Sequence, residues 1–464
     1  MGKPKLWAGI NCHLPVAFFA LGRVESNHKI WDQPMTEKAA DKATPTTQEA
    51  PVGGIRGFFK ILGPGLITGA ADDDPSGIAT YSIAGAQFGT GLLWLSWFSW
   101  PLMGAVQNMC ARIGMVTGTG LAGALRQKFP KPVMILVCLS LLIANTINVG
   151  SDLAAMADAA ALLTGLSSHI YVVLFGLGIS LAVVQFRYYQ IANVLKWLAL
   201  ALGAYIIAAF LSKPNWASIA QSTFTVSIPA GGFATVVAIL GTTISPYLFF
   251  WQSAQEVEEE KAMGRRILIQ RQGATPRQLL NRKIDVAVGT FFSNVVMFFV
   301  IVCTSLTLNA HGITNVSTTN EVAQALEPFA GKFAMLLYTV GIIGVGLLAI
   351  PTLAGSAAYA FSETFRWRHG LDEKWWRARA FYGVFILSAM VGIAMDWIHI
   401  NPISALYWTA VINGVLAPFL LVGVWIVARD EKIMLGQPSS KLSLIVVGLT
   451  IIIMFAVCIG ALVT

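Results

Sequence analysis

The chain has 464 residues, of which 56% are hydrophobic and only 12% are charged, and its mean hydropathy is +0.67. A soluble protein carries about 25% charged residues, so the composition excludes a soluble globular protein and predicts an all-α protein that crosses a membrane many times. The net charge of +8 does not predict nucleic-acid binding, because the basic residues gather in the connections between apolar segments, where they anchor loops.

Eleven apolar segments are long enough to span a membrane, since a bilayer core needs about 20 helical residues. We expect the first five spans to form one repeat (about 60–212), the next five a second repeat (about 231–428), and the last span an additional helix. The eleven segments lie near residues 60–87, 91–117, 132–161, 168–186, 190–212, 231–254, 284–309, 333–362, 380–396, 403–428 and 442–463.

The first apolar segment contains three consecutive carboxylates, Asp72, Asp73 and Asp74, followed by Pro75 and Gly77. Each acidic side chain at bilayer depth costs roughly 2.5–3.5 kcal/mol, so a spanning helix retains three of them only where a cation or water compensates. Pro75 lacks a backbone N–H and breaks the helix, and Gly77 lets the chain unwind. An acidic, broken helix in a membrane predicts a cation site on a transport path.

The sixth segment is interrupted in the corresponding place, with Gly241, Thr242 and Pro246 near its middle. The two breaks occupy matching spans of two five-span halves, and an odd number of spans makes the second half run inverted relative to the first. Paired interrupted spans of this kind indicate a binding site at the midplane of an inverted-repeat transporter. Ordinary proline kinks, which are common in membrane helices, are the alternative interpretation.

The distribution of basic residues predicts the orientation. Twelve Lys and Arg residues follow the sixth and eighth spans, seven in 261–283 and five in 366–379, whereas the loops 213–230 and 310–332 contain only Lys213 and Lys332. Because Lys and Arg concentrate on the cytoplasmic side, we expect a cytoplasmic N-terminus in a plasma or inner cell membrane. The acidic run Glu256–Glu260 is interpreted as a solvated cytoplasmic helix end.

Residues 1–56 are interpreted as a disordered cytoplasmic tail that precedes a transporter domain at 57–464. The apolar run Leu14–Leu21 lacks a suitable cleavage site and is a poor signal peptide. We expect Met35 to be the natural start, so that residues 1–34 carry no function. Five scattered cysteines without a C-x-x-C pair do not predict a disulfide framework or a metal cluster.

Three stretches resemble the Nramp family of divalent-metal transporters. Gly63–Ile67 leading into Asp74–Gly77 is similar to the family's GPG and DPGN motifs, Gln107–Gly118 resembles Q-x-x-x-A-R-L-G-x-x-T-G, and Ile244–Tyr247 stands where the family has M-P-H. The resemblance covers about residues 58–460 and implies the LeuT-type 5+5 inverted repeat with broken helices 1 and 6. It also implies transport rather than catalysis, with no prosthetic group and a divalent cation as the substrate.

The resemblance implies a metal site made by the Asp74 carboxylate and by backbone carbonyls at Ala71 and Thr242. Two positions depart from the family: Gly77 replaces the Asn of DPGN, and Ser245 replaces the Met before the proline. Without the thioether the site offers only oxygen ligands, which suit Mg²⁺ and Mn²⁺ better than softer metals. The trimmed ligands are expected to enlarge the pocket for a partly hydrated Mg²⁺. This pattern resembles the Nramp-related magnesium transporters.

Other polar residues, among them Tyr247, Asp152 and Gln252, are expected around the site, either in a vestibule or directly behind the ligands. Since consecutive residues on an intact helix point about 100° apart, Asp72 and Asp73 are expected to line a vestibule or to bind through water rather than join Asp74 as ligands. Asn413, in the tenth span, is expected to close the external side of the site. Asn145 and Asn148 are interpreted as helix–helix hydrogen-bonding residues.

Proton coupling is not expected. The family's sixth-helix histidines are Tyr247 and Gln252 here, and its D-x-x-E motif is reduced to Asp152 followed by Ala155. Neither a tyrosine nor an amide exchanges protons near neutral pH, and Asp152 has no acidic partner one turn away. Import driven by the membrane potential is therefore the leading interpretation.

Three other functions remain open at this point. The first is a proton-coupled Mn²⁺/Fe²⁺ symporter of the ordinary Nramp kind. The second is a sodium-coupled amino-acid symporter of the same fold, although three aspartates would repel a substrate carboxylate. The third is a membrane enzyme, for which no histidine is suitably positioned. The sequence predicts the lipid bilayer and a divalent cation as partners, and gives no prediction of the oligomeric state.

Overall fold

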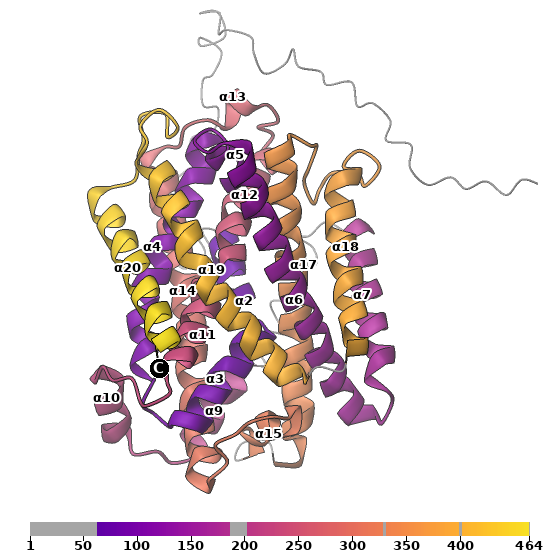
Figure 1. The fold of residues 1–464 in the computed structure, drawn as a ribbon, viewed down its shortest axis with the longest axis vertical. Coiled ribbons are helices and arrows are strands. Elements are labelled where there is room, and N and C mark those ends of the chain that lie inside the picture. The colour runs from indigo at the N-terminus through magenta and orange to yellow at the C-terminus, as the bar shows by residue number, and fades with distance from the viewer. Residues whose placement is uncertain (1–62, 186–201, 328–330, 399–400, 464) are drawn as a thin grey trace, which may run out of the picture. The chain divides into compact units, whose positions relative to one another are not determined.

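The computed structural model describes residues 63–185, 202–327, 331–398 and 401–463, and every regular element in these ranges is helical (Figure 1). The expected tail at 1–56 and the expected start at Met35 lie outside the described residues. The short helices are α5 (Leu121–Leu125), α10 (Trp216–Phe224), α13 (Leu268–Arg271), η3 (Asn309–His311), α15 (Thr319–Gln324), η4 (Gly331–Phe333) and η5 (Asp396–Ile398).

The longer helices reproduce the expected spans. Only the last part of the fifth span, α9, is described. In chain order they are α2 (Pro64–Asp72), α3 (Pro75–Phe88), α4 (Trp94–Thr117), α6 (Lys131–Thr164), α7 (Ser168–Gln185), α9 (Gly203–Leu211), α11 (Phe233–Thr243), α12 (Pro246–Ala262), α14 (Pro276–Thr307), α17 (Ala334–Phe365), α18 (Arg379–Met395), α19 (Pro402–Arg429) and α20 (Lys441–Val463).

Both predicted helix breaks are present. The first span is divided into α2 and α3 around Asp73 and Asp74, and the sixth into α11 and α12 around Ile244 and Ser245. In each case the second half begins with a proline, because the first position of a helix does not need the N–H that proline lacks. The broken helices are the first members of two five-span repeats of inverted orientation, and α20 follows as the additional helix.

The first half of each broken helix packs closely against an unbroken one. A Cβ at Gly69 of α2 would lie 2.4 Å from the backbone of Gly289 in α14, and a Cβ at Gly241 of α11 would lie 2.0 Å from the carbonyl oxygen of Ala410 in α19. Only glycine permits these approaches, which let helix backbones touch in the absence of side chains. Figure 1 shows α2 and α11 in the middle of the bundle.

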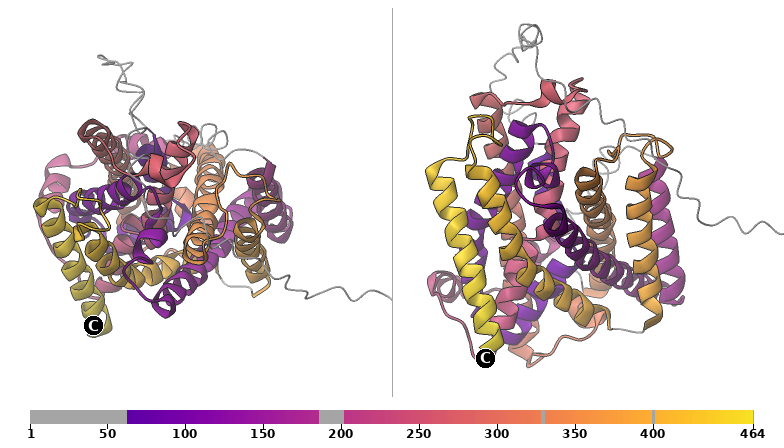
Figure 2. Two further views of the ribbon diagram at one scale, coloured as in Figure 1. Left: turned by 90° about the horizontal axis from the view of Figure 1, so that it is seen from above. Right: turned by 45° about the horizontal axis from the view of Figure 1, so that its top comes forward.

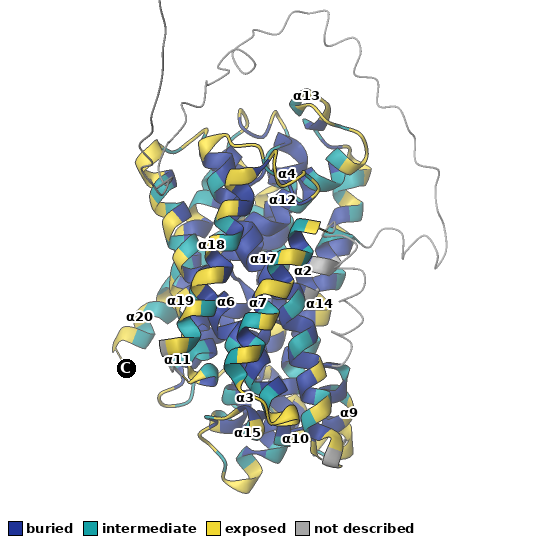
Figure 3. Ribbon diagram, turned by 90° about the vertical axis from the view of Figure 1, so that its right-hand side faces the viewer, coloured by how far each residue is buried: buried dark blue, intermediate teal, exposed yellow. Residues whose placement is uncertain are grey.

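The remaining helices surround this centre. α7 packs against α18, α20 packs against α19 and α11, and both views in Figure 2 place α20 (yellow) and the α7–α18 pair on opposite flanks. Seven helical segments in the described ranges are long and apolar enough to cross a membrane. Exposed positions lie on the outward faces of peripheral helices in Figure 3, and they include large apolar side chains such as Leu136, Leu181 and Ile452. This is the distribution expected where lipid is the solvent.

One part of the connection after the sixth span differs from the expectation. α14 begins at Pro276, capped by Thr275, whose side chain accepts a hydrogen bond from the Gln278 N–H. Arg277, Arg282 and Lys283 therefore lie in the first turns of a helix rather than in a loop. A capping box with proline at the first helical position explains the earlier start, and the sequence Thr275-Pro-Arg-Gln278 contains that signal.

Candidate functional site

Asp74 is fixed by four hydrogen-bond donors at the first break. Its Oδ1 accepts hydrogen bonds from the Ser76 hydroxyl at 2.6 Å and from the Gly77 N–H at 2.8 Å, which makes Asp74 the N-cap of α3. Its Oδ2 accepts from Asn148 Nδ2 at 3.1 Å and from the Tyr247 hydroxyl at 3.4 Å. The side chain is 2% exposed. Asp74 is thus a buried, oriented carboxylate, since side-chain oxygens at N-caps bond the first free N–H groups of a helix.

Tyr247 joins the two breaks. It lies in the first turn of α12, and its hydroxyl donates to the carbonyl oxygen of Ala71 at 3.1 Å as well as to Asp74. Both the expected carbonyl ligand and the expected carboxylate therefore lie within hydrogen-bond distance of one oxygen atom. The sequence interpretation expected Tyr247 either in a vestibule or directly behind the ligands, and its hydroxyl lies between two of the expected ligands.

The second break supplies further oxygen atoms. The Ser245 hydroxyl donates to the carbonyl oxygens of Gly241 at 2.5 Å and Thr242 at 2.8 Å, and the Thr242 hydroxyl donates to Tyr81 at 3.2 Å. Thr242 lies in the last turn of α11, where carbonyl groups have no partner within the helix and are available to other groups. The second break is thus lined by carbonyl and hydroxyl oxygens, the kinds of atom that the family resemblance led us to expect there.

The space beside Gly77 is smaller than expected. A Cβ at this position would meet the Asp72 carbonyl oxygen at 3.4 Å and the Tyr81 ring at 3.4 Å, which are ordinary van der Waals contacts. The Tyr81 ring, fully buried, fills the space that an asparagine side chain would occupy. Beside Gly77, an aromatic side chain therefore takes volume that the sequence interpretation expected to be empty.

Asp72 and Asp73 converge on one residue. The Ser293 hydroxyl of α14 lies 2.5 Å from Asp72 Oδ2 and 3.2 Å from Asp73 Oδ1. An intact helix would point these carboxylates apart, but α2 ends at Asp72 and Asp73 has a non-helical ψ of 50°. The break thus turns both side chains toward α14. Asp72 Oδ1 has no hydrogen-bond partner among the described residues.

The third span contributes a polar face to the site. Asn148 and Asp152 are four residues apart on α6 and so lie on one face of that helix. Asn148 donates to Asp74 and accepts from the Thr409 hydroxyl of α19 at 2.9 Å. Asp152 is fully buried and neither of its oxygens has a hydrogen-bond partner in the described ranges. Asn145 bonds Ser356 and the Leu353 carbonyl, as its interpretation predicted.

Asn148 is the residue that sequence reasoning undervalued. It does form a hydrogen bond between helices, but its partner is the candidate ligand itself. Its spacing of four residues from Asp152 was the available signal. Ser293 and Tyr81 gave no signal, because an isolated serine in an apolar span often bonds a carbonyl of its own helix and an isolated tyrosine is an ordinary core residue.

Two expected residues lie elsewhere. Gln252 donates to Glu256 at 2.7 Å, within α12 and one turn further from the break. Asn413 lies one turn after Thr409 in α19, is 2% exposed, and its Oδ1 has no hydrogen-bond partner among the described residues. Neither is among the groups that hydrogen-bond Asp74 in the described part of the chain.

Asp72, Asp73, Asp74 and Asp152 are here called the break cluster. None of the four takes part in an ion pair within the described ranges. Nor do three or more His, Cys, Asp or Glu side chains in these ranges surround a common metal position. A cation at this point would have Asp74 as its charged ligand and carbonyl or hydroxyl oxygens as the others, a donor set suited to hard divalent ions.

A second group of carboxylates surrounds Arg282 and is here called the arginine cluster. The guanidinium of Arg282 contacts Glu256 at 2.8 Å, Asp285 at 2.5 Å and also Glu259. Asp285 in turn accepts hydrogen bonds from the N–H groups of Gly63 and Gly65, each at 2.8 Å. The cluster therefore ties the beginning of α2 to α12 and α14.

The solvated helix end predicted for 256–260 is thus wrong for two of its residues. Glu256 is 1% exposed and Glu260 is 7% exposed. Glu260 pairs with Arg265 at 3.3 Å. The acidic run and the basic residues that follow it pair with each other and fold back onto the bundle, which charge patterning alone does not distinguish from a solvated end.

Two proteins named as metal transporters are similar to this chain in sequence. A divalent metal cation transporter named MntH from Deinococcus radiodurans is 26% identical over 415 residues, which cover 85% of this chain and 87% of the relative. The protein of the same name from Yersinia pestis (strain Pestoides F) is 28% identical over 311 residues, covering 64% of this chain and 71% of the relative.

Solved structures show the same fold. A manganese transporter of Eremococcus coleocola superposes with a TM-score of 0.70 at 18% identity, over 89% of this chain and 88% of that one. Mhp1, a nucleobase-cation-symport-1 family transporter, superposes with a TM-score of 0.53 at 15% identity, over 82% and 81% of the two chains. The model of the family described as natural resistance-associated macrophage protein-like matches residues 65–464. The chain therefore belongs to the Nramp family and is a membrane transporter rather than an enzyme.

Proposed function

We propose that this protein imports divalent metal cations, Mg²⁺ and Mn²⁺, through an oxygen-lined site between the two helix breaks. The observation that carries the proposal is the position of the Tyr247 hydroxyl, which bonds both the Ala71 carbonyl and the Asp74 carboxylate. A divalent cation that replaced this hydroxyl would meet one carboxylate and one carbonyl at once. Relatives named as divalent metal cation transporters, and a structural neighbour named as a manganese transporter, support the same substrate class.

The preference for hard cations rests on the donor atoms. At Ser245 the chain offers a hydroxyl and no thioether, and at Gly77 it offers no side chain. Carboxylate, carbonyl, hydroxyl and water ligands suit Mg²⁺ and Mn²⁺, whereas thioether sulfur favours softer ions such as Cd²⁺. We also propose, on the same grounds, that this chain belongs to the magnesium-transporting branch of the family.

Potential-driven uptake without proton coupling completes the proposal. At −100 mV, two positive charges moving inward gain about 4.6 kcal/mol. The groups that hydrogen-bond Asp74 are a tyrosine, an asparagine, a serine and a backbone N–H, none of which titrates near neutral pH. The proposed membrane is the plasma or inner cell membrane, with the basic connections at 262–275 and 366–378 on the cytoplasmic side.

Asp152 favours the alternative, a proton-coupled Mn²⁺ or Fe²⁺ symporter. It is a fully buried carboxylate without a hydrogen-bond donor in the described ranges, and it lies close enough to Asp74 for their charges to interact. An isolated buried carboxyl is a reasonable proton carrier, because protonation removes its uncompensated charge. A sodium-coupled amino-acid symporter is less well supported, since the break cluster would repel a substrate carboxylate.

Flux into liposomes distinguishes these functions. The purified protein is reconstituted with a metal-sensitive dye inside, and Mg²⁺, Mn²⁺ and Cd²⁺ are added separately at matched concentrations. The proposal expects Mg²⁺ uptake at millimolar concentration, Mn²⁺ uptake, and little advantage for Cd²⁺. Tight Cd²⁺ binding together with no response to millimolar Mg²⁺ would refute the hard-cation assignment and leave divalent-metal transport itself intact.

A further inference from the structure

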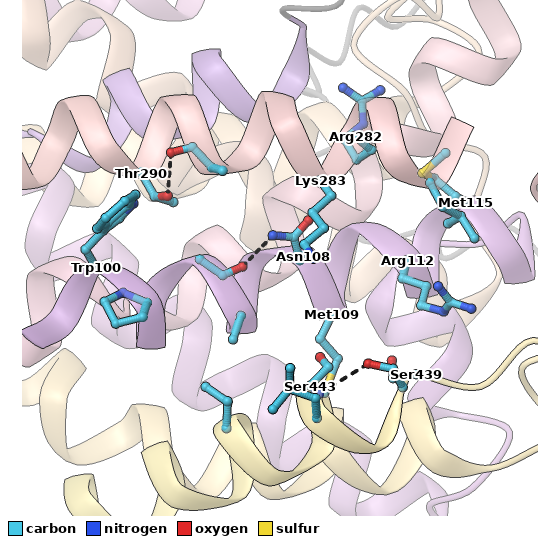
Figure 4. A pocket seen from close by; sticks show the side chains of 18 residues that line it. Trp100, Asn108, Met109, Arg112, Met115, Arg282, Lys283, Thr290, Ser439 and Ser443 are labelled. Carbon is cyan, nitrogen blue, oxygen red and sulfur yellow. Dashed lines mark hydrogen bonds between the residues drawn. The ribbon is translucent and has the colours of Figure 1, made fainter. Parts of the chain in front are cut away.

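A cavity of about 480 Å³ lies between α4, α14 and α20. In Figure 4 side chains from all three helices line it, and none of the residues that hydrogen-bond Asp74 is among the lining residues. α20 is a peripheral helix: only 17% of its most apolar stretch is buried, and Leu442 at its start is 72% exposed. The cavity is therefore at the boundary between protein and lipid, not on the path of the transported ion.

One wall of the cavity is apolar. Trp100 and Pro101 of α4, Leu279 of α14, and Leu442 and Val446 of α20 line it. Gly104 leaves further room, since a Cβ there would meet only the Thr290 hydroxyl at 3.5 Å. An apolar slot that is open toward the bilayer accommodates a hydrocarbon chain without desolvating any polar group.

The other end of the cavity is basic and polar. Lys283 lines the cavity and is exposed. Arg112 also lines it, and within the described ranges its guanidinium forms one hydrogen bond, from Nε to the Gln437 carbonyl oxygen at 3.2 Å. Ser439 also lines the cavity, is 6% exposed, and has a hydroxyl oxygen without a hydrogen-bond partner in the described ranges. A buried hydroxyl of this kind indicates a missing polar partner.

The first turn of α20 lies at the same end. Ser440 caps it through a hydrogen bond to the Ser443 N–H at 3.3 Å, and Ser439, Ser440 and Ser443 all line the cavity. A helix of 23 residues carries a partial positive charge at its N-terminus, where free N–H groups bind phosphate oxygens. Two cationic side chains, an unpaired hydroxyl and a helix N-terminus therefore point to an anionic group.

We propose that this cavity binds one anionic phospholipid. Its phosphate is held by Arg112, Lys283 and the Ser439 hydroxyl, and one acyl chain lies along the apolar wall. A second cavity of about 510 Å³, which shares Arg112 and Leu279 with the first and extends to Gln437, leaves room for the rest of the headgroup. Basic pockets between membrane helices are suited to anionic lipid headgroups.

Arg282 also lines the cavity, but its charge is not available to the lipid. Its guanidinium is committed to the three carboxylates of the arginine cluster, and in Figure 4 it points away from Lys283 and Asn108. A bound lipid would nevertheless contact α14 one residue from Arg282. The site thus adjoins the cluster that holds the beginning of α2.

Native mass spectrometry of the full chain in a neutral detergent tests the proposal. The protein is titrated with dioleoyl phosphatidylglycerol, with dioleoyl phosphatidylcholine and with inorganic phosphate. We expect one tightly bound phosphatidylglycerol per chain, at least tenfold preferred over phosphatidylcholine, and no phosphate adduct at the same concentrations. Equal binding of the two lipids would overturn the proposal, and so would phosphate that displaces the lipid at equal concentration.

Variants locate the site. Arg112→Gln with Lys283→Gln should remove the preference for phosphatidylglycerol, whereas Arg266→Gln with Arg377→Gln, which removes the same charge from exposed positions outside the cavity, should preserve it. The double variant also loses the hydrogen bond from Arg112 to the Gln437 carbonyl, which could destabilise the protein. Lys283→Gln alone changes only an exposed side chain, so it tests the site without that loss. A preference unchanged by Lys283→Gln and by the double variant would overturn the assignment.

A third variant tests the acyl chain. Gly104→Leu should fill the apolar slot and weaken both lipids by about the same factor, without altering the ratio between them. Undiminished binding of phosphatidylglycerol by this variant would show that the lipid lies elsewhere and would overturn the proposed pose. Metal flux by the same proteins is measured separately, so that failure of the lipid site and failure of the proposed transport function are distinguishable.

Discussion

The break cluster and the arginine cluster are both groups of mostly buried carboxylates beside the first broken helix, but they differ in which groups compensate their charge. In the arginine cluster three carboxylates surround Arg282, and two backbone N–H groups complete Asp285. In the break cluster Asp72, Asp73 and Asp74 accept hydrogen bonds from hydroxyl, amide and N–H donors, Asp152 has no donor in the described ranges, and none of the four forms an ion pair there. The arginine cluster contains its own cation, whereas no cationic side chain in the described ranges pairs with the break cluster.

This difference is the basis on which we assign a structural role to the arginine cluster and propose a transport role for the break cluster. Buried charges persist where a fixed partner compensates them, and removing that partner is costly. A carboxylate group without a fixed partner is retained in a membrane protein where a mobile cation can supply the charge. The two clusters therefore make opposite predictions for substitution: loss of flux without loss of stability at the break, and loss of stability at Arg282.

The largest expected effect on transport is that of Asp74→Ala. It removes the charged ligand, so divalent-cation flux into liposomes should fall to the level of empty vesicles, while size-exclusion behaviour in detergent stays unchanged. Asp158→Ala is the matched control, because it removes the same kind of side chain from α6 at a position further along the helix than Asp152. This variant should retain flux. Wild-type flux from the Asp74 variant would show that the ligand assignment is wrong.

The largest expected effect on stability is that of Arg282→Met. Removing one partner from a buried ion pair costs about 3–5 kcal/mol, because the remaining carboxylates lose their compensation. The melting temperature in detergent should fall clearly. Lys128→Met, which breaks the Lys128–Asp430 pair with its 44% exposed lysine side chain, should change it little, since exposed pairs contribute roughly 0–1 kcal/mol. Equal melting temperatures for both variants would contradict a structural role for the arginine cluster.

A smaller effect is expected on selectivity. Ser245→Met together with Gly77→Asn supplies a thioether and an amide, and should shift the ratio of Cd²⁺ to Mg²⁺ uptake by about tenfold, equivalent to roughly 1.4 kcal/mol. The Cβ at position 77 fits, but the amide must displace the Tyr81 ring. Tyr81→Phe serves as the control for that displacement. An unchanged ratio in the double variant would mean that other atoms determine selectivity.

Energy coupling should show no proton signal. With a pH-sensitive dye inside liposomes, metal entry should cause no acidification beyond the leak of empty vesicles, and a valinomycin potential, negative inside, should speed uptake. If acidification accompanies flux and Asp152→Asn abolishes it, Asp152 is a proton carrier and the symporter alternative is correct.

The smallest expected effect is a pH dependence outside both clusters. Burial, with Lys261 and Arg271 nearby, lowers the pKa of His369 to about 4. Because the unfolded chain binds this proton near pH 6.5, stability should fall as the pH decreases from 6.5 toward 4. His369→Gln should flatten this dependence of the melting temperature without altering flux at pH 7. An identical pH profile in the variant would assign the dependence to other groups.

Much of the fold could be predicted from the sequence. The spans, the two breaks and the inverted repeat follow from long apolar runs interrupted by Pro75 and Pro246, because a membrane allows few alternatives to helices and proline ends them. Asp74 could be placed at the break for the same reason. Lateral packing could not be predicted, since the closeness of Gly69 to Gly289 depends on which helices become neighbours.

The rest of the site depends on such neighbours. Ser293 lies 220 residues from Asp73 in the chain, and Tyr247 lies 173 residues from Asp74, so no local pattern links them. The burial of Glu256 also depends on Arg282, 26 residues away on another helix. Polar residues in apolar spans indicate that a partner exists, but only the packing of helices determines which partner it is.

The four donors that hold Asp74 also bear on the transport cycle. The import proposed above, without a co-substrate, requires the protein to reorient with its site empty before it accepts the next ion. Ser76, Gly77, Asn148 and Tyr247 hydrogen-bond the Asp74 carboxyl group in the structure without metal, which lowers the cost of keeping this polar group buried during that step. We infer that these groups set the speed of the return step, and thus the turnover rate at saturating metal.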